Sequence, residues 1–140
     1  MATLNLKISE EISIGGENRG STKSIAIDSI TTYNQSLIDV PTTVFVNVVN
    51  FNAVESVGTY VPSNLKYLRI TAVTPGQASE TVIIKLVTAS ESHEIKLKNG
   101  NSFMMFDGQA GDGTAFVDLT SIQAKASNSS SQVDLFVASL

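Results

Sequence analysis

The feature that most constrains this chain is a two-residue period in its apolar residues. Leu4, Leu6 and Ile8 share one phase near the start, and Leu68 and Ile70 share one further along. Side chains of a strand point alternately to opposite faces, so this period predicts β-strands and not helices. No stretch shows a convincing helical period, and we therefore expect an all-β protein.

Turn-forming residues divide the alternating stretches into about eight or nine strands, which is typical of an antiparallel β-sandwich or a jelly roll. An Asn99-Gly100 pair favours a tight hairpin, because Asn-Gly readily supplies positive φ angles. With 140 residues and no internal repeat or linker, the chain is predicted to form a single β-sandwich domain over residues 1–140. The expected strands are 3–14 (one interrupted strand or two short ones), 24–31, 42–51, 65–73, 81–88, 94–98, 102–106, 116–126 and 132–138.

The surface is expected to be polar but weakly charged. Charged residues make up 16% of the chain, against about 25% in ordinary domains, while 42% is hydrophobic. Such a surface loses little on desolvation against a partner protein. The net charge of −4, without a basic stripe, argues against nucleic-acid binding. We also expect no secretory signal, since residues 1–8 alternate, and no membrane span.

Several expected strands are apolar on both faces, whereas a solvated sandwich strand alternates with polar residues. Either long loops or a closed barrel cover the second face, or neighbouring subunits do. The opposing sets are Val44, Val46 and Val48 against Phe45, Val49 and Phe51; Val82, Ile84 and Leu86 against Ile83 and Val87; and the run 103–106.

The residues offer little for catalysis. The chain has no cysteine and one histidine, His93, which we interpret as a half-exposed strand residue. The glycine-containing segment 15–24 has the glycine spacing of a phosphate-binding loop, but Ser21 stands where that motif needs lysine directly after its second glycine. We interpret the segment as a hairpin loop. Three aspartates, Asp107, Asp112 and Asp118, flank a glycine-rich loop but fit no calcium-loop spacing. We predict no catalytic, cofactor-binding or metal site, and no enzyme activity.

The segment 3–14 is the feature most suggestive of function. A long alternating strand at a chain end, followed by glycines, can pair with a neighbour's sheet edge as well as with its own sheet. Residues 1–14 are therefore either an exchanged N-terminal arm or an ordinary first strand.

Two stretches carry a resemblance: LKYLRIT at residues 65–71 and, two strands later, LKNGNSF at 97–103. They resemble small virion structural proteins of tailed bacteriophages, especially marine ones, over about the central and C-terminal two thirds of the chain. The shared pattern is a strand followed by a hairpin and brings no catalytic residues. The resemblance implies a β-sandwich component of a virus particle, assembled in the host cytoplasm.

We therefore expect a bacteriophage structural protein that binds major capsid or tail proteins as a decoration or cement module. It would be a homo-oligomer or bound in a lattice, without nucleic acid, membrane or cofactor as partner. The expected docking elements are the segment 3–14 and the loops 52–63 and 107–115. The alternative is a carbohydrate- or receptor-binding β-sandwich module, although the chain has no Trp and three Tyr as sugar platforms.

Overall fold

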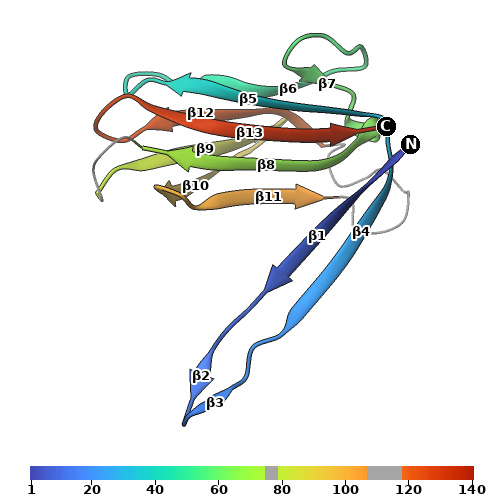
Figure 1. Cartoon of the computed structure of the whole chain (residues 1–140). Coiled ribbons are helices and arrows are strands. Elements are labelled where there is room, and N and C mark those ends of the chain that lie inside the picture. Colours follow the sequence, from blue (N-terminus) through green and yellow to red (C-terminus); the bar gives the residue numbers. More distant parts are fainter. Residues whose placement is uncertain (75–78, 107–117) are drawn as a thin grey trace.

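The structure, a computed structural model, describes residues 1–74, 79–106 and 118–140. Its main body is a β-sandwich of a five-stranded and a four-stranded sheet (Figure 1). The five-stranded sheet has the order β10 (Ser92–Lys98), β9 (Thr81–Thr88), β12 (Leu119–Ala126), β6 (Val46–Phe51) and β7 (Thr59–Tyr60). The four-stranded sheet has the order β11 (Ser102–Phe106), β8 (Leu65–Val73), β13 (Ser131–Ser139) and β5 (Thr32–Val40). A short 3₁₀ turn, η1 (Pro62–Asn64), precedes β8.

The strand order is that of a jelly roll. Apart from the short β7, the connections from β5 to β6, β8 to β9, β10 to β11 and β12 to β13 each cross between the sheets. Apart from β9 with β10 and β6 with the short β7, strands of the sandwich that are adjacent in the sequence therefore lie in opposite sheets instead of pairing, as in a jelly roll. Pairing among the described strands is antiparallel except between β6 and β7. The predicted all-β sandwich is confirmed.

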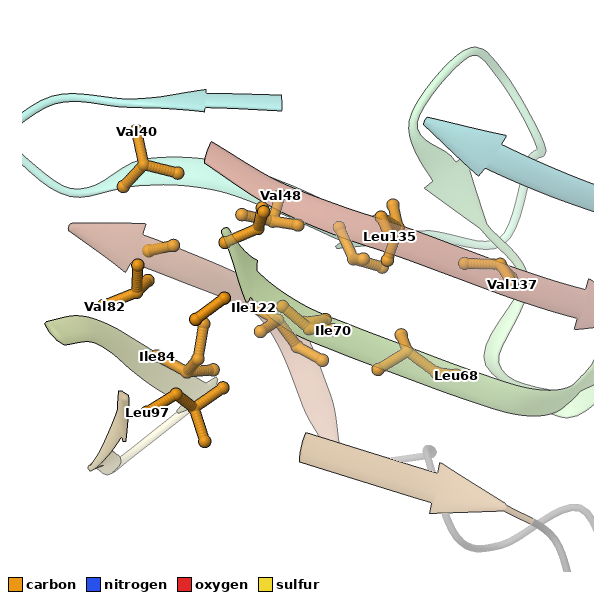
Figure 2. Close-up of a cluster of buried hydrophobic side chains, with 14 of the residues drawn as sticks. Val40, Val48, Leu68, Ile70, Val82, Ile84, Leu97, Ile122, Leu135 and Val137 are labelled. Atoms are coloured by element: carbon orange, nitrogen blue, oxygen red, sulfur yellow. The ribbon is translucent and has the colours of Figure 1, made fainter. Parts of the chain in front are cut away.

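The core lies between the two sheets and is made of branched aliphatic side chains (Figure 2). The inward positions of β8 and β13 alternate with outward ones, as the sequence period predicts: Leu68 and Ile70 face the core, opposite Tyr67 and Arg69. Each fully buried aliphatic side chain stabilises the fold by about 1.5–3 kcal/mol. The side chains with almost no exposure are Val40, Val49, Leu65, Leu68, Ile70, Val82, Ile84, Ile122, Val133, Leu135 and Val137.

The remaining four strands form a separate two-stranded ribbon. It consists of β1 (Ala2–Ser9) paired with β4 (Thr22–Ile30), and β2 (Ser13–Ile14) paired with β3 (Glu17–Asn18). Figure 1 shows this ribbon, in blue, leaving the end of the sandwich where both termini lie and diverging from it. We call residues 1–30 the arm. Among the described residues, no helix has the length and apolar character needed to cross a bilayer.

Two local predictions were wrong. The strands 94–98 and 102–106 do not form a hairpin, because β10 pairs with β9 while β11 pairs with β8 in the other sheet. The Asn99-Gly100 turn does form, with Gly100 at a φ of 79°, but it joins the two sheets. Strand β5 was not expected at all, since its sequence TYNQSLIDV has no apolar alternation.

Much of the apolar excess is covered by the chain itself. In β6 a register irregularity lets both Val48 and Val49 reach the core. The ring of Phe45 contacts two lysines, with Lys85 Nζ and Lys125 Nζ each 5.0 Å from its centroid. The outer face of the four-stranded sheet is covered at one end by the arm.

Candidate assembly surface

The arm is two-stranded along nearly its whole length. Between its two ladders, the backbone N–H of Glu10 donates to Ser21 O at 2.7 Å, and that of Arg19 donates to Ile12 O at 2.8 Å. Gly20 lies against this ladder, and a Cβ there would be 1.8 Å from Glu10 O, so only glycine fits. The arm is thus one continuous ribbon in which β1 pairs with β4 of the same chain. The exchange of residues 1–14 between copies stays a prediction.

A tight turn closes the far end of the ribbon. Gly15 and Gly16 have φ angles of 62° and 84°, which is the backbone of a two-residue hairpin turn with both central residues at positive φ. The residues flagged for phosphate binding, 15–24, therefore form this turn and the return strand, with no helix after them. This agrees with the interpretation of the segment as a hairpin.

The base of the arm packs on the outer face of the four-stranded sheet. Ile27 and Ile30 of β4 are buried in a cluster with Tyr67 of β8 and Ala138 of β13. Side chains partly buried against this cluster are Leu4, Leu6 and Ile25 from the arm and Phe106 and Phe136 from the sheet. At the junction, the Thr31 backbone N–H donates to Ser139 O at 3.0 Å. The base is therefore held by apolar packing and by a backbone hydrogen bond to the end of β13.

A β-bulge sets the direction of the arm. Ile27 and Ile30 lie an odd number of positions apart, so a regular strand would point them to opposite faces. The register of β1 and β4 shifts between Ala2 and Leu4, and Ser29 adopts a φ of 64°. This irregularity brings both isoleucines into the same cluster and bends the strand, as bulges do. Ser29 is the one non-glycine residue at positive φ in the described part of the chain.

The far half of the arm has no such cover. Ile12 and Ile14 continue the phase of Leu4 and Leu6, yet they are 52% and 60% exposed. A two-stranded ribbon without a covered face is at best marginally stable in water. The arm therefore carries one apolar face, covered by its own sandwich near the base and bare near the turn.

The end of the arm is acidic. Residues 10–21 hold three glutamates, Glu10, Glu11 and Glu17, and one arginine, Arg19. Arg19 and Glu17 form an exposed ion pair at 2.8 Å. The remaining two carboxylates, those of Glu10 and Glu11, directly precede Ile12, so a basic rim on a partner surface would complement them.

Among the described residues, the others flagged in the sequence do not gather into a site. His93 lies exposed on β10, with Nε2 3.6 Å from Glu91 Oε2. Asp118 is exposed. Asp107, Asp112 and the predicted docking loop 107–115 lie outside the described residues. Within the described ranges, no three His, Cys, Asp or Glu residues come close enough to hold a metal ion.

A shallow cavity of about 430 Å³ opens where the first half of β5 faces the residues before β7. Its polar groups include Asn34 and Glu55, and Asn34 Nδ2 donates to the Tyr60 hydroxyl at 3.0 Å. The predicted docking loop 52–63 thus borders this cavity together with β5, the strand at the end of the four-stranded sheet. Sequence reasoning missed the cavity because β5 was not recognised as a strand.

No protein-family model, curated protein or solved structure matches this chain.

Proposed function

We propose that this chain is a structural protein of a bacteriophage particle, where it binds capsid or tail proteins as a decoration or cement module. The arm is its attachment element. The observation that carries the proposal is the apolar face of the arm, whose base is covered by the chain's own sheet and whose far half is bare.

The energetics favour a partner for this face. Residues near the turn gain nothing from the sandwich, since the ribbon diverges from it (Figure 1). Burying the remaining surface of Ile12 and Ile14 against a neighbour would recover about half of the 1.5–3 kcal/mol that complete burial of each isoleucine provides. A projecting ribbon with free edges can also add strands to a partner's sheet.

The particle itself is suggested by the resemblance at residues 65–71 and 97–103. The fold agrees with such a role, because jelly rolls are used in viral capsid proteins. Jelly rolls also occur in lectins, so this agreement is an analogy at the level of the fold.

Multivalency explains how a modest contact can serve this function. One arm buries only a small apolar area, so a single attachment is expected to be weak. Many copies bound to one particle engage together, and linked contacts raise the overall avidity by orders of magnitude. The proposal therefore expects weak binding to an isolated partner subunit and retention on an assembled particle.

The experiment is co-sedimentation of the purified protein with particles of the phage whose genome encodes it, using isolated capsids and isolated tails separately. Saturable binding to capsids supports a decoration module, and binding to tails supports the tail form of the proposal. A protein that sediments with neither, and is absent from purified virions by mass spectrometry, contradicts it. Bovine serum albumin at the same mass concentration controls for trapping.

A carbohydrate-binding module is the second candidate, and the cavity beside β5 favours it. Hydroxyl, amide and carboxylate groups there surround Tyr60, and such groups recognise sugars. Reproducible hits on a glycan array that disappear with Tyr60→Ala would favour this candidate over the first.

A further inference from the structure

Strand β5 ends the four-stranded sheet, and its second edge pairs with no strand in the described part of the chain. It is a long edge of nine residues, paired in unbroken register with β13 on its other side. It contains no lysine, arginine or proline, and Asp39 is its one charged residue. Natural proteins protect edges of this kind with charge, proline, a bulge or short length, and of these β5 has only the single charge of Asp39.

The other sandwich edges are protected. At the far side of the five-stranded sheet, β10 carries Glu94, Lys96 and Lys98. Strand β7 at the opposite end has two residues, and β11 has five. Protection at these three edges makes the open edge of β5 the exception in the sandwich.

The outward side chains of β5 make the strand complementary to itself. Tyr33 and Leu37 are 75% and 57% exposed, although both are apolar in character and lie on a sheet face. Tyr33 lies two positions before Gln35, and Leu37 lies two positions after it. If two β5 strands paired antiparallel about Gln35, each Tyr33 would lie opposite the Leu37 of the other copy, and aromatic–aliphatic cross-strand pairs of this kind are stabilising.

Tyr33 is already positioned for such a contact. Its ring stacks on Phe136 of β13, with the centroids 6.2 Å apart and an angle of 19° between the planes. The amide of Gln35 donates to Asp134 Oδ1 at 3.1 Å, which fixes the central side chain as well. Because these side chains are already held in place, pairing would cost little additional side-chain conformational entropy, which favours association.

We infer that two copies of this chain pair through β5, antiparallel and centred on Gln35, which joins their four-stranded sheets across a two-fold axis. A two-fold contact uses the same patch on both copies, as the placement of Tyr33 and Leu37 requires. Near the start of β5 the patch is bordered by the loop before β7, where Val54 and Val57 are exposed. The contact does not depend on the proposed particle, and it does not use the bare far half of the arm, where Ile12 and Ile14 lie.

A single introduced cysteine tests the register, because the natural chain has none. In a pair centred on Gln35, the two Gln35→Cys residues lie directly opposite, with Cα atoms about 4.5–5.5 Å apart, which a disulfide can span. Asp39→Cys is the matched control on the same strand and face. Its two copies would be roughly 26 Å apart at 3.3 Å per residue.

The expected result is a disulfide-linked dimer that forms under mild oxidation at least tenfold faster for Gln35→Cys than for Asp39→Cys. Equal rates, or faster linkage by Leu37→Cys, overturn the proposed pairing. Mass measurement of the unlinked natural protein should give twice the 14.9 kDa of one chain at high micromolar concentration. A monomer under those conditions also overturns the inference.

Charge at the edge provides a second test that needs no crosslink. Leu37→Lys should raise the dimer dissociation constant at least tenfold, because lysine protects an edge against pairing. Val44→Lys is the control, since Val44 is also 57% exposed but lies outside β5. The double variant Ile12→Thr and Ile14→Thr should remain dimeric. If it becomes monomeric, the arm holds the dimer and the β5 pairing is wrong.

Discussion

The bare half of the arm should contribute to assembly and almost nothing to folding, and the double variant Ile12→Thr and Ile14→Thr separates the two. Threonine keeps the β-branched shape that suits a strand and replaces a methyl-bearing carbon by a hydroxyl. Both isoleucines are more than half exposed and lie beyond the part of the arm that packs on the sandwich, so the unfolding free energy of the sandwich should change by no more than about 0.5 kcal/mol.

The expected loss in binding follows from the exposed fractions. Complete burial of an isoleucine is worth about 1.5–3 kcal/mol, and 52% and 60% of these two residues remains to be buried. Together they offer roughly 2–3 kcal/mol per arm, which corresponds to a loss of about 30- to 140-fold in the affinity of one contact. On a particle the loss should be larger, because every copy loses the same contact.

Titration of labelled protein onto phage particles measures this loss, and thermal unfolding measures the stability. Val44→Thr is the control, because Val44 is similarly exposed but lies between β5 and β6, outside the arm. Its binding should match that of the natural protein. If the double variant binds as tightly as Val44→Thr, the bare isoleucines do not contact the particle and the role assigned to the arm is wrong.

Substitutions at three other positions test the bend of the arm and the sandwich. Ser29→Val should destabilise the arm by about 1 kcal/mol or more, because a β-branched residue fits poorly at a φ of 64°, whereas Ser29→Gly should be tolerated. Amide exchange in residues 2–9 should be faster in Ser29→Val than in Ser29→Gly, and equal exchange in the two variants would contradict this role of Ser29. Glu80→Ala should lower the free energy of unfolding by about 1–3 kcal/mol, because the buried carboxylate accepts hydrogen bonds from the N–H groups of Asn128 and Ser129 at 3.4 and 3.3 Å. An unchanged melting temperature would contradict that role. Burial raises the pKa of the Tyr67 phenol above its ordinary 10.0, against the opposing charge of Arg69, so above that pH the unfolded chain releases a proton that the folded chain keeps. Stability should therefore fall as the pH rises beyond 10.0, and less steeply in Tyr67→Phe; identical slopes in alkaline denaturation would refute this origin.

Strands whose inward positions are strongly apolar could be predicted from the sequence. The bounds expected for β8 and β9, residues 65–73 and 81–88, match those of the structure. Both strands lie inside their sheets, where a neighbour on each side and a core below leave only apolar residues suitable for the inward face. The pattern therefore contained enough information to place them.

Strand β5 could not be found in this way, because it lies at an edge and beside an open cavity. Its inward residues Asn34 and Ser36 are polar, which removes the two-residue period on which the prediction depended. The same polarity gave no signal for the cavity. An edge strand without apolar alternation is recognisable only once its partner, here β13, is known.

The hairpin error has a different cause. A turn sequence such as Asn99-Gly100 specifies the local backbone but not the sheet that each flanking strand joins. In the structure, Gly100 N–H donates to Ala72 O at 2.8 Å, so the turn is tied to β8 and the chain changes sheets. Similarly, the alternation of residues 3–14 predicted a strand but gave no indication of the bulge at Ser29 that bends the arm away.

Hydrogen–deuterium exchange of the arm, free and bound to the particle, tests the central claim most directly. In the free protein, amides of residues 10–21 should exchange rapidly, since the ribbon there has no covered face, and amides of β13 should be slow. On the particle, the exchange of residues 10–21 should slow at least tenfold. Protection that appears elsewhere on the chain while these residues stay unprotected would show that the particle is bound without the arm.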